Sequence, residues 1–443
     1  MGVIMQAFYW DCPKAENCEY HWWEFLQNKI PELSAAGFTA LWIPPVNKAA
    51  SSTSMGYDPY DYYDLGAYDQ RGAISTWFGS KQTLVDLITE AHEHRMQVYA
   101  DLVLNHNSGA DETEVNPEDG QERWTKFTPK SGKFLRDWTC FHPSLYESFD
   151  GYVFEGMPDL CHRNPLVYTE MIEYARWLLE EIKIDGFRYD CVKGYGAWMV
   201  RSIQELRGLN FNQPYKPFGV GECWDSQREI TDWLSEANSW SDNPVAAFDF
   251  NLRYRLKDLC MNPGFSLKQL VQPGTLINDG RVTEAVTFVE NHDVVREDSI
   301  INDKMLAYAF ILTHEGYPCV FWQDYFNWHL AEAGKVSGIA RLVEVHEKYA
   351  GGDTSVLYVD DDLYIMQRNG HGSQQGLIFV LNNSPWWEGK WVATKWNNTK
   401  FVPVAWRGKY SIDTPDVKFS NDDGWGDFFA PARGYVVYVP VEL

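Results

Sequence analysis

Residues 81–106 read KQTLVDLITEAHEHRMQVYADLVLNH, and they contain a predicted helix followed by a predicted strand. Four apolar residues of the first part recur at helical spacing: Leu84, Leu87, Ile88 and Ala91. This spacing predicts a helix over 81–94. The stretch 97–104 is almost continuously apolar, as expected of a strand that is buried on both faces. A helix that leads into such a strand is typical of a parallel sheet.

The same alternation of helix and strand recurs up to about residue 350. Short apolar stretches that predict strands cover 2–9, 39–43, 97–104, 186–189, 218–221, 245–248, 285–289 and 318–321. Longer amphipathic stretches that predict helices cover 21–36, 81–94, 165–181, 197–206, 227–235, 254–261, 304–313 and 339–349. Eight such alternations predict an α/β fold, the closed (β/α)8 or TIM barrel.

Two parts of the chain depart from this pattern. Residues 107–163 have no long periodic segment, so we expect an inserted loop-rich domain after strand 3. The tail, 351–443, has short β-type stretches separated by Gly, Asn and Asp, which predicts a C-terminal all-β sandwich domain. The barrel itself would then comprise 1–106 and 164–350.

The composition excludes several classes of function. The 443 residues carry 38 Lys and Arg against 62 Asp and Glu, a net charge of −24. This charge argues against nucleic-acid and anionic-membrane partners, because both attract cations. The longest apolar stretch, near 305–313, is too short to span a bilayer. No charged segment precedes an apolar one at the N-terminus, so the protein is either intracellular or has lost a leader. We expect an extracellular monomer whose signal peptide has been removed.

Three acidic residues follow predicted strands, at the barrel end where catalytic groups lie. They are Asp190, Glu222 and Asp293. Glycosidic cleavage needs one carboxylic acid to protonate the leaving oxygen and one carboxylate to attack the sugar. Arg188 lies two residues before Asp190, on the same side of the strand, and would keep that carboxylate ionised. Apolar surroundings would favour the protonated form of Glu222.

Four segments resemble, in chain order, the four short signature regions of the α-amylase family, glycoside hydrolase family 13. They are DLVLNH (101–106), GFRYDCVKG (186–194), GECW (221–224) and FVENHD (288–293). The stretches GFTALWIPP, MGYDPYDYYDLG and GYPCVFWQDY match the family as well. Within the family, GVIMQAFYWD, SMGYDPYD and VKGYGAW resemble the archaeal type of α-amylase.

The resemblance implies a retaining enzyme that hydrolyses internal α-1,4-glucosidic bonds in starch, glycogen and malto-oligosaccharides. Asp190 would be the nucleophile, Glu222 the general acid/base and Asp293 the transition-state stabiliser. The implied substrate-binding residues are Arg188, His106, His292, Tyr57, Asp58, Lys193 and Gly194. Many family members have Lys-His where this chain has Lys193 and Gly194, so one side-chain contact to the leaving sugar is missing.

The resemblance also implies a Ca²⁺ ion between the barrel and the insert. Its ligands would be Asn105, Asp150, Asp159 and the carbonyl of Gly194. Carboxylate, amide and carbonyl oxygens are the hard ligands that calcium takes. An ion there would fix a polar insert to the barrel.

Three alternatives stay open. A family transglycosylase or an exo-acting malto-oligosaccharide-forming enzyme would use the same acids. A non-catalytic glucan-binding protein would not need them, and a metal-dependent TIM-barrel hydrolase would need more strand-end histidines than His106 and His292. Aromatic residues make up 16% of the chain, and their rings suit stacking on sugars. Five C-terminal tryptophans could bind glucan in this way, but we expect them in the sandwich core: Trp386, Trp387, Trp391, Trp396 and Trp406.

Overall fold

The computed structural model describes residues 2–14, 21–154, 156–210, 213–410 and 413–441. The chain forms two compact units. The first comprises Met1–Gln6, Ala35–Thr39 and Asp249–Leu443, and the second comprises Ala7–Ser34 and Ala40–Phe248. Each unit is described by itself below.

Eight strands form a closed barrel, as the sequence predicts. In chain order they are β1 (Ile4–Gln6), β2 (Ala40–Ile43), β5 (Gln97–Leu102), β8 (Gly186–Tyr189), β11 (Phe218–Gly221), β12 (Ala246–Phe248), β13 (Ala285–Phe288) and β14 (Tyr317–Phe321). The registers of β2 with β5, β5 with β8 and β8 with β11 are all parallel. Asp190 and Glu222 directly follow β8 and β11, and Asp293 lies beyond the end of β13.

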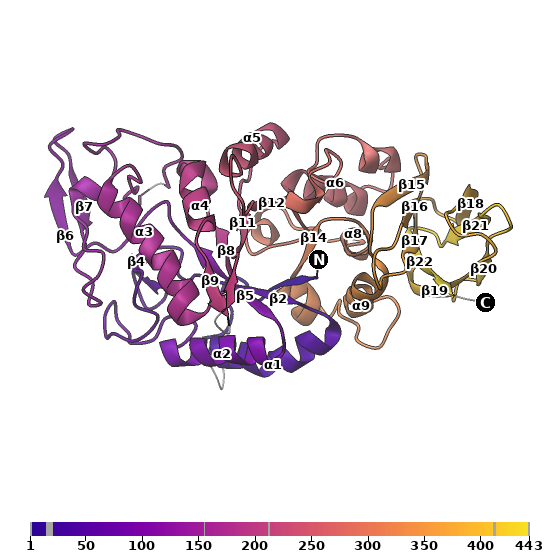
Figure 1. Cartoon of the computed structure of the whole chain (residues 1–443), viewed down its shortest axis with the longest axis horizontal. Helices are drawn as coiled ribbons and strands as arrows, with labels where there is room; N and C mark the ends of the chain where they lie inside the picture. The colour runs from indigo at the N-terminus through magenta and orange to yellow at the C-terminus, as the bar shows by residue number, and fades with distance from the viewer. Residues whose placement is uncertain (1, 15–20, 155, 211–212, 411–412, 442–443) are drawn as a thin grey trace. The chain divides into compact units, whose positions relative to one another are not determined.

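In the second unit, helices separate the strands β2, β5, β8, β11 and β12 (Figure 1). These helices are α1 (Trp22–Ala36, whose last two residues belong to the first unit), α2 (Lys81–Glu93), α3 (Pro165–Trp177), α4 (Ala197–Gln204) and α5 (Gln227–Ala237). α2 begins at Ser80, whose hydroxyl accepts the backbone N–H of Thr83 in a capping box. α3 begins with Pro165 after the cap residue Asn164, since proline fits the first helical turn.

Between these elements lie short hairpins. β3 (Lys48–Ala49) pairs with β4 (Pro59–Asp61), and β9 (Gly208–Asn210) pairs with β10 (Gln213–Tyr215). In the insert, β6 (Glu112–Val115) pairs with β7 (Glu122–Lys126). The insert also has a buried centre, because the Arg136 guanidinium lies over the rings of Phe127 and Phe134 at 4.4 and 4.6 Å. It is therefore better packed than its polar sequence suggests.

The first unit contains β1, β13 and β14 with the remaining helices. These are α6 (Phe250–Met261), α7 (Val294–Glu297), α8 (Met305–Thr313) and α9 (Ile339–Tyr349). Every residue of α8 is buried, as expected of a helix that is apolar on all sides. In the described ranges, no helix combines the length and the apolar character that crossing a membrane requires.

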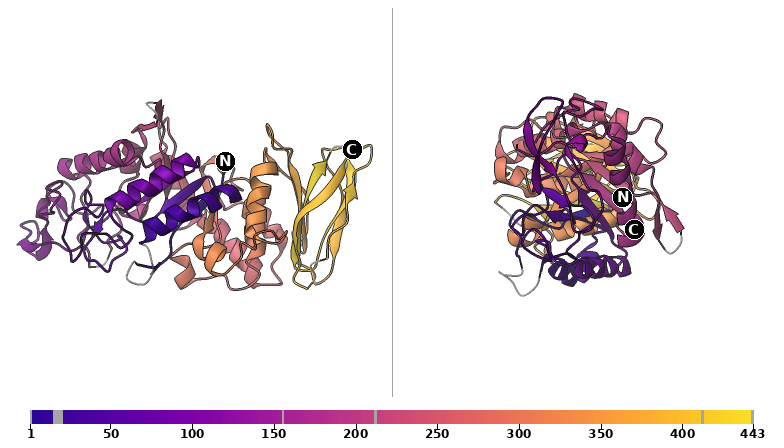
Figure 2. Two further views of the ribbon diagram at one scale, coloured as in Figure 1. Left: turned by 90° about the horizontal axis from the view of Figure 1, so that it is seen from below. Right: turned by 90° about the vertical axis from the view of Figure 1, so that its left-hand side faces the viewer.

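The C-terminal part of the first unit is a β-sandwich, as predicted. One sheet has six strands in the order β15 (Thr354–Val359), β16 (Leu363–Arg368), β17 (Leu377–Asn382), β22 (Gly434–Val441), β19 (Lys400–Arg407) and β20 (Lys418–Phe419). The other sheet pairs β18 (Glu388–Ala393) with β21 (Trp425–Ala430). The left view of Figure 2 shows the two layers in yellow.

The placement of the five C-terminal tryptophans corrects one expectation. Trp396 and Trp406 pack against the sandwich core, as predicted. Trp386, Trp387 and Trp391 are 71%, 42% and 52% exposed. The prediction of a core position is therefore wrong for these three. Trp386 and Trp387 precede β18, and Trp391 lies on it. The buried side of this strand is occupied by Val392.

Candidate active site

The side chain of Arg188, in β8, lies among three carboxylates. Its Nη1 is 2.7 Å from Asp101 Oδ1 and 2.5 Å from Asp190 Oδ1. Its Nη2 is 2.8 Å from Glu222 Oε2. Burial alone would lower the pKa of Arg188, but the surrounding carboxylates raise it well above its usual value. One permanently charged guanidinium therefore holds Asp190 and Glu222 close together.

The backbone explains why these two carboxylates are neighbours. β8 and β11 run parallel with Tyr189 opposite Gly221, so Asp190 and Glu222 follow at the same level. The N–H of Cys191 donates to Glu222 Oε2 at 3.1 Å. The expectation of apolar surroundings for Glu222 is wrong, because Arg188 reaches across to the neighbouring strand and contacts its carboxylate.

Asp101 belongs to this cluster, although it lies inside β5 and not after it. Its Oδ2 accepts hydrogen bonds from the Tyr57 hydroxyl at 2.8 Å and from Trp42 Nε1 at 3.2 Å. Burial raises the pKa of Asp101, and Arg188 opposes this effect. The sequence does contain a signal for this residue, since Asp101 is an acid in an apolar strand and stands opposite Arg188 in the register.

Several predicted substrate-binding residues surround the same cluster. The Tyr57 ring lies 5.2 Å from that of Trp10, and the Tyr57 carbonyl oxygen is 2.9 Å from His106 Nε2. Asp58 accepts a hydrogen bond from the Ser54 hydroxyl, and burial raises its pKa. Tyr57 thus contacts Asp101 through its hydroxyl and His106 through its carbonyl oxygen.

Lys193 and Gly194 follow Asp190 in a short 3₁₀ turn. The Lys193 ammonium donates to the Trp224 carbonyl oxygen at 3.0 Å and lies 3.6 Å from Asp225. Trp224 and Asp225 lie two and three residues after Glu222 in the chain. Lys193 is therefore placed beside the chain segment that carries Glu222.

In the first unit, His292 and Asp293 follow β13. His292 is buried, and its Nδ1 is 2.9 Å from Gln6 Nε2 at the end of β1. Its Nε2 is 3.2 Å from Asp293 Oδ2. The Asn291 side chain accepts the backbone N–H groups of Asp293 and Val294 at 2.9 and 2.8 Å. These contacts orient a partly exposed Asp293 carboxylate.

The predicted calcium ligands also lie close together. The atoms Asn105 Oδ1 and both carboxylate oxygens of Asp159 are buried and have no hydrogen-bond partner, whereas Asp150 Oδ1 lies 3.0 Å from His142 Nε2. A Cβ atom on Gly194 would lie 1.7 Å from Asn105 Oδ1, so only glycine fits there. Burial and the neighbouring Asp150 raise the pKa of Asp159 to about 7. A group of buried, unpartnered oxygens is what a hard cation would stabilise.

Two sets of side chains in this region have ligand atoms within 4.8 Å of one another: His142, Asp150 and Asp159, and His142, Glu147 and Cys161. His142 Nε2 is 3.0 Å from Asp150 Oδ1. His142 therefore lies beside the predicted calcium ligands, although the sequence did not indicate it as one of them.

The chain is similar to known proteins over most of its length. The family profile "Alpha amylase, catalytic domain" matches residues 23–328, and "Alpha-amylase C-terminal" matches 377–439. An α-amylase of Geobacillus stearothermophilus is 31% identical over 99% of this chain and 87% of its own length. A glucan 1,4-alpha-maltohexaosidase of Bacillus sp. (strain 707) is 29% identical over 99% of this chain and 92% of its own.

Among solved structures, an α-amylase from Malbranchea cinnamomea superposes with a TM-score of 0.72 at 17% identity, over 99% of this chain and 96% of that one. At this identity the likeness concerns the fold. The barrel, its strand-end carboxylates and the family profile define a glycoside hydrolase. The chain belongs to the α-amylase family.

Proposed function

We propose that this enzyme is a retaining α-amylase that hydrolyses internal α-1,4-glucosidic bonds in starch, glycogen and malto-oligosaccharides. The observation that carries the proposal is the contact of one guanidinium, Arg188, with both Asp190 and Glu222. Retaining glycosidases hold their two carboxyl groups about 5–5.5 Å apart, whereas inverting enzymes leave room for a water molecule. A shared guanidinium supports the shorter separation.

The proposed reaction has two steps. Protonated Glu222 gives its proton to the glycosidic oxygen while the Asp190 carboxylate attacks the anomeric carbon. The C–O bond to the leaving chain breaks, and a covalent glycosyl-enzyme ester forms. Glu222, now ionised, takes a proton from water, which attacks the anomeric carbon and releases Asp190. Asp293 would stabilise the positive charge that develops on the sugar.

We propose the remaining roles on the family resemblance and on the contacts above. His106 and His292 would hydrogen-bond sugar hydroxyls, and Tyr57 would stack on the sugar ring with Asp58 beside it. Lys193 and Gly194 would lie on the leaving-group side. Arg188 would act as a positioning residue.

We also propose that Asn105, Asp150, Asp159 and the Gly194 carbonyl hold Ca²⁺. The buried, unpartnered oxygens of Asn105 and Asp159 support this assignment. A bound divalent cation would supply positive charge and fix the insert to the end of β5. The chain's own residues carry out both steps of the proposed reaction.

The test is incubation of the purified enzyme with soluble starch, beside Asp190→Asn and the surface variant Asp119→Asn. We expect rapid loss of iodine colour with slow release of reducing ends, and α-anomeric products at early times. Asp190→Asn should lose at least about four powers of ten in kcat, since a nucleophile is removed. Asp119→Asn should match the wild type. Near wild-type activity of Asp190→Asn, or β-anomeric products, would refute the mechanism.

One relative's name favours a second candidate, an exo-acting malto-oligosaccharide-forming enzyme, because that relative is a glucan 1,4-alpha-maltohexaosidase. The same incubation distinguishes the two. An exo-acting enzyme releases one oligosaccharide from the start while iodine colour persists. A transglycosylase instead makes chains longer than the oligosaccharide supplied.

Several narrower features stay predictions. These are the likeness to the archaeal type, the extracellular location, the monomeric state and the domain limits 1–106 with 164–350, 107–163 and 351–443. The profile match to 377–439 supports a separate C-terminal domain. Cell fractionation and sedimentation would test the location and the oligomeric state.

A further inference from the structure

The outer face of the two-stranded sheet β18–β21 carries exposed aromatic rings. In the register, Trp391 stands opposite Asp427, Ala393 opposite Trp425, and Gly389 opposite Phe429. Residues that oppose each other, or that lie two apart on one strand, share a face of the sheet. The two indoles therefore lie on one face, and Trp391 and Trp425 are 52% and 41% exposed. We call these six residues the outer β18–β21 face.

The other face of the same sheet is the sandwich core. Val392, Phe428 and Ala430 are buried there, among residues of the larger sheet. The exposure of Trp391 and Trp425 therefore does not reflect a loosely packed domain. The inner faces of β18 and β21 pack on the sandwich core, while the rings of Trp391 and Trp425 face outward.

Small residues lie opposite two of the aromatic rings of the outer β18–β21 face. Ala393 and Gly389 are the cross-strand partners of Trp425 and Phe429. A Cβ atom on Gly389 would lie 2.4 Å from Cγ of Phe429, so that ring lies directly over the glycine backbone. Diagonal neighbours on one face are about 7–8 Å apart, and their Cβ atoms are somewhat closer. The indoles of Trp391 and Trp425, which are diagonal neighbours, are thus close enough to contact successive units of one bound chain.

The backbone that presents these rings is held in place. The side-chain oxygen of Asn421 accepts the backbone N–H of Trp425 at 2.9 Å. The backbone N–H of Asn421 donates to the Trp425 carbonyl oxygen at 2.8 Å. On the loop that leads into β18, the Trp386 carbonyl oxygen accepts hydrogen bonds from Asn382 and Ser384 at 2.6 and 3.1 Å. A platform that is already ordered loses little conformational entropy when it binds.

The charge of the face indicates which ligand it suits. Lys418 Nζ is 3.2 Å from Asp427 Oδ2 and lies over the Phe429 ring at 4.7 Å. The charge of Asp427, the one ionisable residue among the six, is thus balanced by this lysine. The face carries no Leu, Ile or Met. Flat aromatic rings beside a balanced ion pair suit an uncharged polymer of sugars better than an anionic or aliphatic partner.

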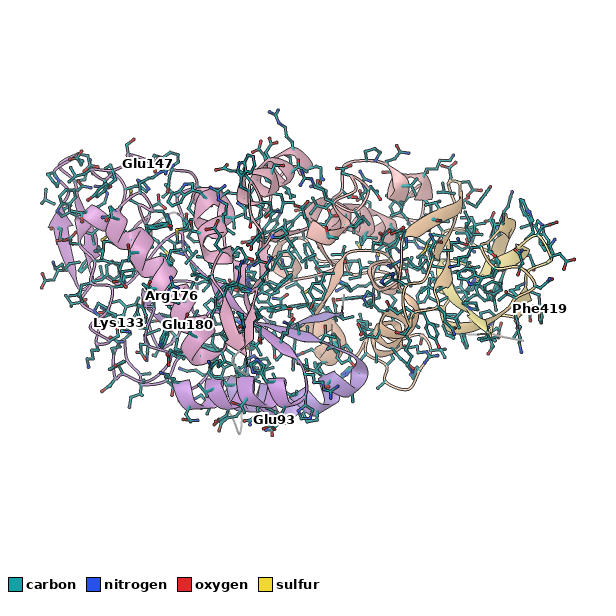
Figure 3. All side chains as sticks on the ribbon, in the orientation of Figure 1. Glu93, Lys133, Glu147, Arg176, Glu180 and Phe419 are labelled. Atoms are coloured by element: carbon teal, nitrogen blue, oxygen red, sulfur yellow. The ribbon has the colours of Figure 1, made fainter. Side chains whose placement is uncertain are left out.

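We propose that the outer β18–β21 face, with Trp391 and Trp425 as its stacking rings, is a non-catalytic binding site for α-glucan chains. Phe419, which Figure 3 labels, lies on the neighbouring strand β20 and is 55% exposed. The choice of α-glucan rests on the proposed function, since a polymer held at this face is the substrate of the same molecule. Binding at two sites raises the effective concentration of polymer at the catalytic site.

The test compares the wild type with Trp391→Ala, Trp425→Ala and the double variant, each in the Asp190→Asn background so that the polymer persists. Binding is measured as retardation in native gels that contain glycogen and as adsorption to starch granules. We expect the double variant to lose about tenfold in apparent affinity, which corresponds to about 1.4 kcal/mol. Trp240→Ala is the matched control, because Trp240 is a 99% exposed indole outside this face; it should bind as the parent does.

A second measurement separates this proposal from the proposed function. With Asp190 intact, the double variant should hydrolyse a short malto-oligosaccharide at the wild-type kcat/KM but attack starch granules more slowly. Absence of oligosaccharide hydrolysis in the wild type would refute the proposed function but not the glucan site on the outer β18–β21 face. Unchanged granule binding by the double variant would refute that site. A change from dimer to monomer on sedimentation, with granule binding unchanged, would show that a second copy of this chain covers the face instead.

Discussion

Arg188 is the residue on which the geometry of the two central carboxylates depends. Its planar guanidinium offers separate nitrogens to Asp190 and Glu222, whereas a lysine ammonium is a single point charge. We expect Arg188→Lys to lower kcat by on the order of a hundredfold or more with a much smaller change in KM, because positioning contacts of this kind act mainly in the transition state. Steady-state kinetics on malto-oligosaccharides would measure both constants.

The control for this variant is Arg123→Lys, at an exposed ion pair with Asp119 in the insert. Exposed pairs contribute little, so its kinetics should equal those of the wild type. Because Arg188→Lys keeps the positive charge, a large effect reports geometry. An unchanged kcat would mean that the carboxylates are positioned without the guanidinium.

At the residue scale the sequence predicts the strand-end carboxylates and Arg188, but it misses Asp101, which lies inside β5. Asp190 and Glu222 are identified because carboxylates that follow barrel strands face the catalytic end. Asp101 is missed because its importance lies in a partner on the next strand, Arg188, and not in its own position. The apolar environment expected for Glu222 fails for the same reason, since the contact crosses from one strand to another.

At the scale of elements, the predicted cation would connect the end of β5 to the insert. Binding at 100 times Kd stabilises a fold by about 2.7 kcal/mol. We therefore expect chelation to lower the Tm of the wild type by roughly 5–10 °C, and added Ca²⁺ to restore it. Differential scanning calorimetry in excess Ca²⁺ and in chelator measures the difference.

Asp159→Asn sharpens this prediction. With chelator, the variant should be at least as stable as the wild type, because it removes a buried carboxylate whose two oxygens have no partner. With Ca²⁺, it should be less stable than the wild type, because a charged ligand is lost. This reversal of order is specific to a cation site, and Asp119→Asn should show none of it. A wild-type Tm that changes with neither chelator nor added Ca²⁺ would exclude the proposed Ca²⁺ site.

The elements themselves were predicted well where periodicity is long and poorly where it is short. All eight barrel strands and the helices between them follow the apolar pattern. The hairpins β3–β4, β6–β7 and β9–β10 are not predicted from the sequence, since such short strands show no measurable alternation. The exposed Trp391 shows the same limit, because hydrophobicity alone does not distinguish the two faces of a narrow sheet.

At the scale of the whole molecule, the C-terminal sandwich is a structural part of the first unit. The Arg433 side chain, on the loop before β22, donates to the carbonyl oxygens of Leu259 and Cys260 in α6 at 2.5 and 2.8 Å. His314, at the end of α8, has its Nε2 2.9 Å from the Tyr364 hydroxyl of β16 and stacks on Phe310. Buried polar groups therefore connect the sandwich to helices of the barrel.

His314 makes this connection sensitive to acid. Burial lowers its pKa to about 3, whereas an unfolded histidine has a pKa near 6.5. Below pH 6.5 the unfolded chain binds a proton that the folded protein does not, so stability is lost as the pH falls from about 6.5 towards 3. The loss between pH 6.5 and 4.5 should be roughly 2–3 kcal/mol from this residue.

His314→Gln keeps a polar side chain at this position and removes the titration. It should lower stability at pH 7, because the stacking on Phe310 is lost, but should flatten the dependence on pH. Urea unfolding at pH 7 and pH 4.5 gives the difference for each protein, and groups common to both cancel in the comparison. His371→Gln, at an exposed turn, is the control and should keep the wild-type dependence. Equal pH dependence of His314→Gln and the wild type would mean that folding does not change the pKa of His314, and that the acid sensitivity of the molecule arises elsewhere.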